Sequence, residues 1–301
     1  MPNTVSVSAL TEAINVRRDE LIVKSATSSK SAKYFYTMLG VKHKEAVPTL
    51  DSTVVLQDGS VCGWDPAGTD TFGKVEVEVF AAEVEKEFCQ REFENTWLNY
   101  QLRWAAGMET LPVEDKIIES QLAQINLAVE NAIWSGNTAI GLTGITEQLD
   151  NLSGVTTNVS LTSGDTIVEK IDKVVAALKQ DALSNPGGVQ VFLSYSDFRA
   201  WVMAKNAICC ANQPIIDAAS ETYGYPGDSR VTLIPVAGLE GGNRIYATPY
   251  QGFVYATDIE NSENIYDFWF DRKEAKFLFR VLFMLGVAVR YPSLTVRGVI
   301  A

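Results

Sequence analysis

The stretch PVEDKIIESQLAQINLAVENAIWS, residues 112–135, places an apolar side chain at every third or fourth position. That spacing is the period of an amphipathic helix, and the acids Glu114 and Asp115 fall in its favourable first turn. A helix of this length spans on the order of 35 Å, long enough to form the backbone of a domain. Gly136 and Asn137 are expected to end it. The apolar stripe consists of Ile118, Leu122, Ile125, Val129 and Ile133.

The residues before this helix have the pattern of a second helix. From Ala81 onward the chain carries bulky side chains at helical spacing, and Gly107 is expected to end the run. We therefore predict a helix over 81–107 that packs an aromatic face into the core. That face comprises Val84, Phe88, Phe93, Trp97, Tyr100 and Trp104.

Residues 47–80 are predicted to form a long hairpin. Its strands are TVVLQ at 53–57 and KVEVEVF at 74–80, separated by a stretch rich in glycine and proline. In the second strand valines alternate with glutamates, which is the period of a strand with one wet face. Two strands alone cannot bury a core, so the hairpin needs a further surface, with Trp64 and Phe72 as its anchors. An ordinary hairpin that packs on its own domain is an equally favoured alternative.

The N-terminal residues are basic, although the chain is acidic. Residues 1–44 contain seven Lys and Arg against three acids, whereas the whole chain has 25 Lys and Arg against 37 Asp and Glu. A short amphipathic helix is expected over 8–23, followed by the flexible stretch KSATSSKSAK at 24–33. Contact with an acidic surface of a neighbouring copy is favoured, and a solvated tail is the alternative. The lysines concerned are Lys24, Lys30 and Lys33.

After the long helix we expect a loop over 136–151 and a second unit from about residue 155. Its first helix is predicted over 167–182 with an N-cap within 162–165, and the buried strand VQVFLS follows it. A helix capped by Ser196 comes next, as in a mixed α+β layer. The remaining chain is predicted to be mostly strands, at 231–236, 244–249, 252–257, 263–270, 276–291 and 294–300.

The composition argues against several classes of function. The formal net charge of -12 leaves no broad cationic face for reading nucleic acids. The single histidine, His43, lies beside lysines and is expected at the surface. One imidazole cannot build a multi-histidine metal site, and a surface one serves no catalytic triad. The glycine clusters at 136–144 and 238–242 lack the lysine of a phosphate-binding loop, so neither a cofactor nor a metal is expected.

The four cysteines, Cys62, Cys89, Cys209 and Cys210, show no CxxC spacing, so we expect reduced thiols in an intracellular protein. The first twenty residues lack the apolar core of a signal peptide. The most hydrophobic stretch, 277–289, is short and contains Arg280. It is expected in a core, and no membrane contact is predicted.

One enzymatic hypothesis comes from the acidic residues Glu76, Glu78, Glu83, Glu85 and Glu87. Two carboxyls at a suitable separation can hydrolyse a glycosidic bond. Alternating acids are also typical of a solvated face, which we consider the better explanation. A carboxylate-based hydrolase that uses Glu76 and Glu78 is the alternative from another functional class, and otherwise no catalytic residue is predicted.

The order of these elements resembles the major capsid protein family of tailed bacteriophages, the Hong Kong 97 fold. A basic arm, a long hairpin and a helix ending in AVENAIWSGNTAIGLTGI at 128–145 are similar to the family's N-arm, E-loop and spine helix. The stretches at 165–182, 186–201 and 227–236 resemble its axial domain, and 270–300 resembles its closing strands. The resemblance implies an α+β capsid fold.

The resemblance also implies a division of the chain into five regions. They are an N-terminal arm over 1–46, the E-loop over 47–80, a peripheral domain over 81–154 with spine helix 112–135, an axial domain over 155–250, and closing strands over 251–301 shared between the two domains.

The function implied by this resemblance is structural. Copies would assemble as pentamers and hexamers into an icosahedral head that encloses double-stranded DNA as non-specific contents. The head would form in the host cytoplasm, with portal and scaffold or decoration proteins as partners. An encapsulin-like nanocompartment of the same fold is the alternative. Contacts between copies are expected at Trp64, Phe72, Val75, Val77, Lys24, Lys30 and Lys33.

Overall fold

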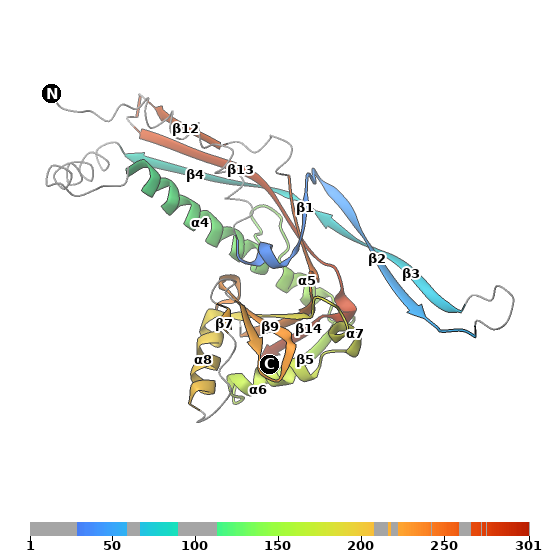
Figure 1. Cartoon of the computed structure of the whole chain (residues 1–301). Helices are drawn as coiled ribbons and strands as arrows, with labels where there is room; N and C mark the ends of the chain where they lie inside the picture. Colours follow the sequence, from blue (N-terminus) through green and yellow to red (C-terminus); the bar gives the residue numbers. More distant parts are fainter. Residues whose placement is uncertain are drawn as a thin grey trace.

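The computed structural model describes residues 29–58, 67–89, 113–207, 216–217, 222–241, 243–258, 266–271, 273–274 and 276–300. They form an upper layer, a lower lobe and a hairpin that projects away from both (Figure 1). Helices and strands occur together in the layer and in the lobe, as the predicted α+β class requires.

The upper layer is a sheet that lies along one long helix. Helix α4 (Val113–Ser135) coincides with the predicted spine helix to within one residue. Strand β13 (Lys276–Val289) runs beside it and pairs antiparallel with β4 (Phe80–Cys89) and β12 (Tyr266–Asp271), as Figure 1 shows. Gly136 ends the helix as predicted, with the positive φ of 77° that favours glycine.

Side chains from this sheet and from α4 form one core. Every second residue of β13 points toward the helix, so its hydrophobic run is buried within the chain, as predicted. In the described part of the chain, no helix combines the length and apolarity needed to cross a membrane. The buried residues are Phe279, Val281, Phe283 and Leu285 from the strand, and Ile125, Val129 and Ile133 from the helix.

The prediction of a helix from Ala81 is wrong for its first nine residues. Residues 80–89 form β4, which pairs with β13 from Phe80 opposite Leu285 to Cys89 opposite Lys276. The sequence of residues 81–89 fits the two-residue period of a strand as well as a helical period. The residues form a strand because they can hydrogen-bond along one edge of β13. The rest of the predicted helix, with Phe93, Trp97, Tyr100 and Trp104, lies outside the described residues.

The lower lobe is a seven-stranded sheet covered by short helices. Helices α6 (Ile167–Ala176) and α8 (Tyr195–Asn206) pack on the sheet, burying Ile171 and Trp201. In spatial order the strands are β5 (Thr157–Leu161), β14 (Val296–Ile300), β10 (Arg244–Pro249), β6 (Val189–Ser194), β9 (Asp228–Val236), β8 (Thr222–Tyr225) and β7 (Ile216–Asp217).

Several helix ends in the lobe differ from the predictions. The helix predicted over 167–182 is interrupted, and its last turn forms the separate helix α7 (Gln180–Leu183). Its N-cap is Thr166, which with Glu169 forms a capping box, so the predicted cap within 162–165 is wrong.

Two further helices in this part of the chain differ from the predictions. Helix α8 is capped by Ser194, whose hydroxyl accepts from the Asp197 amide, because the helix starts two residues earlier than the predicted Ser196 cap allows. The predicted loop over 136–151 contains helix α5 (Ile145–Asn151). The sequence there has a helical apolar pair, Ile145 and Leu149, and both side chains are buried.

The predicted hairpin exists, but both of its strands are longer and begin earlier than predicted, and Phe80, predicted in the second strand, belongs to β4. Strands β2 (Lys44–Val54) and β3 (Gly68–Glu78) pair antiparallel without a register shift. The prediction at 53–57 excluded the residues around Pro48. Proline is tolerated here because β2 is the edge of a two-stranded sheet, where its missing N–H faces no partner.

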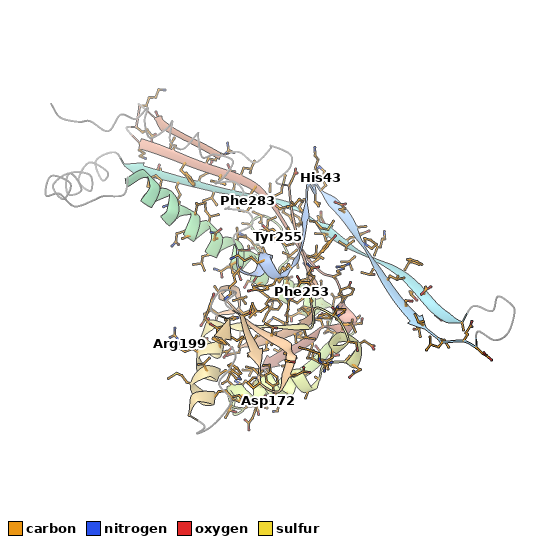
Figure 2. All side chains as sticks on the ribbon, in the orientation of Figure 1. His43, Asp172, Arg199, Phe253, Tyr255 and Phe283 are labelled. Atoms are coloured by element: carbon orange, nitrogen blue, oxygen red, sulfur yellow. The ribbon has the colours of Figure 1, made fainter. Side chains whose placement is uncertain are left out.

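A cluster of aromatic rings joins the layer to the lobe. Trp134, at the end of α4, stacks on Tyr246 of β10 with ring centroids 5.9 Å apart. Phe35, Phe192 and Phe253 surround the indole within 6 Å. Strand β11 (Phe253–Thr257) pairs with β13, and Figure 2 places Phe253 and Tyr255 between the two parts. These rings fix the angle between layer and lobe.

The prediction of a flexible stretch over 24–33 is wrong for its last residues. Ser31–Tyr34 form a short 3-10 helix, η1, in which Ser31 and Ala32 are buried, as is Ser29 before it, and Ser31 is hydrogen-bonded to Glu130 and Trp134 of α4. The small side chains that suggested flexibility allow this close approach. The chain continues as β1 (Tyr36–Leu39), which pairs parallel with β11. Residues 8–23, predicted as a helix, lie outside the described residues.

We predict that replacing Trp134 destabilises the whole subunit. Trp134→Ala should lower the free energy of unfolding by about 3–5 kcal/mol, since it empties a closely packed aromatic site. Leu127→Ala is the matched control on the same helix, because Leu127 is 45% exposed, and it should cost less than about 1 kcal/mol. Urea unfolding of dispersed subunits measures both. Equal losses in the two variants would contradict a stabilising role for the aromatic cluster.

Candidate assembly surface

The root of the hairpin belongs to the chain's own core. Residues paired across two strands share a face, and the next pair points to the opposite face. Val47 and Val77 are buried and Val75 is half-buried, and all three lie on one face. They cluster with Val254 of β11 and Ala288 of β13.

Beyond Pro48 the apolar side chains stand on the other face of the hairpin. Leu50 is paired with Phe72, and these side chains are 58% and 81% exposed. Val54 lies further out on the same face and is 81% exposed. We call Leu50, Val54 and Phe72 the distal apolar face; the hydrogen-bonded polar pair Ser52 and Asp70 lies on the same face between them. The opposite face of this outer half is polar and consists of Thr49, Asp51, Thr53, Thr69 and Thr71, with Gly73.

The distal apolar face is in solvent in the isolated chain. Figure 1 shows the outer half of the hairpin extending away from both the layer and the lobe. Leu56, just past the end of β2, is 96% exposed. A two-stranded sheet is marginally stable by itself, and a directly paired set of exposed apolar side chains such as Leu50 and Phe72 marks an interaction site. This half of the hairpin is therefore suited to lie on a second molecule.

Some of the residues predicted to contact other copies are exposed in the structure, and others are buried. Phe72 is exposed at the place predicted. Leu50 was missed because the first strand was placed too far along the chain, and Val54, inside the predicted strand, was not named as a contact. Val77 is wrong as a contact, since it is completely buried in its own chain. Val75 also faces that core, although half-buried. Trp64 lies outside the described residues.

The predicted lysine contacts have different outcomes. The Lys30 ammonium lies 3.3 Å from the Tyr195 hydroxyl and 5.1 Å from the centre of that ring, so it has a partner within its own chain. Lys33 is exposed and stays a predicted contact. Lys24 lies outside the described residues, as do Cys62, Cys209 and Cys210.

The carboxylate pair proposed for hydrolysis is not arranged for that chemistry. Glu76 and Glu78 are exposed on the hairpin, and Lys44 and Lys74 both form ion pairs with Glu76. Hydrogen bonds from these lysines lower the pKa of Glu76 to about 2. A general acid for glycoside hydrolysis needs a raised pKa, so Glu76 is in the wrong protonation state for that role.

The remaining acids of the hydrolase hypothesis lie on the outer face of the upper sheet. Glu83 forms an ion pair with Arg280, and Glu87 does so with Lys276 at 3.0 Å. Glu85 is exposed between them. These contacts cross from β4 to β13 at the surface, as expected for a solvated face. His43 is exposed at the root of the hairpin, which confirms its predicted surface position (Figure 2).

A buried carboxylate ties the N-terminal segment to α4. Glu130 is 4% exposed, and it accepts hydrogen bonds from the Ser31 amide at 3.1 Å and from the Ser31 hydroxyl. The same hydroxyl accepts from the Trp134 indole N–H at 2.7 Å. Burial raises the pKa of Glu130, and the hydrogen bonds from Ser31 and Trp134 and the charge of Lys30 offset only part of this effect.

A cleft with a volume of about 350 Å³ lies between α5 and the end of α4. Its Asp150 is bound by Arg244 at 3.1 Å and by Arg297, which links α5 to the lobe's sheet and leaves that carboxylate occupied. Among the described residues no three His, Cys, Asp or Glu side chains gather as metal ligands. The cleft is lined by Ser135, Thr146, Glu147, Asp150, Gly238, Leu239, Glu240 and Arg244.

The solved structures that this chain resembles include chains of phage capsids. A chain of the satellite phage P4 procapsid, which includes the size determination (Sid) protein, aligns over 98% of this chain and 97% of its own length, with a TM-score of 0.60 at 9% identity. A chain from Gordonia phage Cozz gives 0.56 at 12% identity over 91% and 86%. The capsid of Myoviridae phage XM1 gives 0.52 at 12% identity over 89% and 90%.

These comparisons confirm the fold predicted from the order of elements, the capsid fold of tailed phages. At such identities the likeness shows the fold alone. No protein-family model matches the sequence, and neither does a curated protein.

We predict that Glu130 makes the stability of the subunit depend on pH. Because its pKa is raised in the folded state, the stabilisation is fully present below the ordinary value of 4.5 and is lost as pH rises through the folded value. Glu130→Gln cannot titrate. The unfolding free energy of the wild type minus that of Glu130→Gln should therefore fall between pH 4 and pH 8.

Urea unfolding across this pH range checks the prediction. Glu147→Gln, at an exposed position of α5, is the control and should follow the wild type at each pH. A difference between wild type and Glu130→Gln that stays constant or grows with pH would show that the buried carboxyl does not favour its proton.

Proposed function

We propose that this chain is a structural major capsid protein, whose copies assemble as pentamers and hexamers into an icosahedral phage head around double-stranded DNA. The observation that carries the proposal is the match in fold to a procapsid chain over 98% of this chain, together with a hairpin whose outer half has an uncovered apolar face. A shell subunit meets several neighbours, so side chains exposed in the isolated chain become buried on assembly.

The distal apolar face supplies the main contact in this proposal. Its Leu50 and Phe72 would lie on a neighbouring subunit, since the root of the hairpin already uses its other face against the chain's own core. Trp64 is proposed to contribute to the same interface, and Lys33 of η1 is proposed to contact an acidic surface of a neighbouring copy. The ordering of a projecting element on its neighbour couples assembly to local stability.

The domain division is part of the proposal. We assign 81–154 to a peripheral domain and 155–250 to an axial domain, with 251–301 shared between them. This division is supported by the course of the last strands, since β13 lies mostly in the upper layer and β14 in the sheet of the lobe.

The proposed cargo and partners follow from the charge of the chain and from the function. A net charge of -12 suits a wall that encloses DNA without binding it tightly. We propose that the head forms in the host cytoplasm with a portal and with scaffold or decoration proteins. Pairing of Glu76 with two lysines argues against the hydrolase alternative.

We predict that Phe72→Asp blocks assembly without unfolding the subunit. A charge at this position cannot be buried against an apolar partner, so the protein concentration needed for assembly should rise at least tenfold. The unfolding free energy of the dispersed subunit should change by less than about 0.5 kcal/mol, because Phe72 is 81% exposed. Light scattering and electron microscopy measure assembly.

Thr53→Asp is the matched control, because it adds the same charge to the polar face of the outer hairpin. It should assemble close to the wild-type concentration. If Phe72→Asp forms shells as readily as Thr53→Asp, the distal apolar face is not a contact between copies.

A further inference from the structure

Two tyrosine rings hold the guanidinium of Arg290 at the lower end of β13. Its central carbon lies 4.8 Å from the centre of the Tyr36 ring and 5.0 Å from that of Tyr291. The Arg290 amide donates to the Gly252 carbonyl oxygen at 2.9 Å, which extends the ladder between β13 and β11. The guanidinium is therefore positioned by stacking on both rings and by a rigid backbone.

The charge of Arg290 is not neutralised by any described residue of its own chain. The side chain is half-buried, and its Nε is buried without a hydrogen-bond partner in the described structure. The other half-buried arginines of the described ranges all pair with acids. Arg244 and Arg297 pair with Asp150, and Arg280 pairs with Glu83.

The stack lies beside the root of the hairpin. Tyr36 is in register with Val254, and Val254 with Ala288, so these three side chains share one face of the sheet. That face carries the valines of the hairpin root. Tyr36 remains 36% exposed at the edge of this cluster. The guanidinium is thus reachable at the place from which the proposed assembly contact projects.

The chemistry of the stack specifies the group it would bind. A planar guanidinium that packs on aromatic rings binds other groups through the N–H donors along its edge, and that edge matches the two oxygens of a carboxylate. In a chain with 37 acids against 25 basic residues, the most abundant carboxylates in an assembly belong to other copies of the same chain.

We propose that Tyr36, Arg290 and Tyr291 form a carboxylate-binding contact that receives an acidic side chain from a second copy of this chain. This inference rests on the proposed function. It adds a polar contact to the apolar contact of the distal hairpin, and the polar contact would set how two copies align. Asp181, exposed in the first turn of α7, is an example of the acidic groups available.

Two measurements test this contact. In the first, assembly of Arg290→Gln, Arg290→Lys and Arg199→Gln is followed against protein concentration and salt. Arg290→Gln should raise the concentration needed for assembly at least tenfold and weaken its dependence on salt, while Arg290→Lys should have a smaller effect. Arg199, exposed on α8 and labelled in Figure 2, is the control for loss of one positive charge, and its variant should stay within twofold of wild type.

In the second measurement, a photoreactive benzoylphenylalanine replaces Tyr36 in the otherwise wild-type chain, which keeps an aromatic ring on Arg290. Irradiated shells should give links to a second copy, within a peptide that contains Asp or Glu. Links confined to one chain would overturn the proposal, as would equal weakening of assembly by Arg199→Gln and Arg290→Gln. Normal assembly of Arg290→Gln would refute this contact alone, whereas wild-type protein that never assembles would contradict the proposed function as well.

Discussion

The structure depends on one constraint, which is that the hairpin cannot cover its own apolar side chains. Val47 and Leu50 are three residues apart on β2, an odd step that places them on opposite faces of the strand pair. The inner one is buried against the chain's own sheet, and the outer one is exposed. The inner half of the hairpin therefore packs on its own chain, and the outer half is left free to contact a second molecule.

This arrangement works only if the body holds the hairpin in a fixed direction. The aromatic cluster around Trp134 and the paired Asp150 of α5 join the layer to the lobe at two places. Glu130 and Ser31 tie the N-terminal segment to the same helix, and that segment leads through β1 into the hairpin. Packing at the joint thus positions the surface at which neighbouring copies would meet.

The long helix, helices α6 and α8 and the strands β6, β9, β10 and β14 could be predicted from the sequence, because their apolar spacing fits one period only. The caps of α6 and α8 were misplaced by one or two residues. The residues from Ala81 to Cys89 fit both periods, and pairing with β13, almost two hundred residues away, makes them a strand. The predicted first strand of the hairpin, 53–57, begins after Leu50, so the pairing of Leu50 with Phe72 was missed. Burial of Ser31 could not be predicted either, since it depends on Glu130 and Trp134 from a distant helix.

Cryo-electron microscopy of the assembled chain tests the central claim most directly. The account predicts closed particles in which Leu50, Val54 and Phe72 are buried against a neighbouring subunit, while Val47 and Val77 stay packed on their own chain. Particles in which the outer half of the hairpin remains in solvent, or folds back on its own body, would contradict the account.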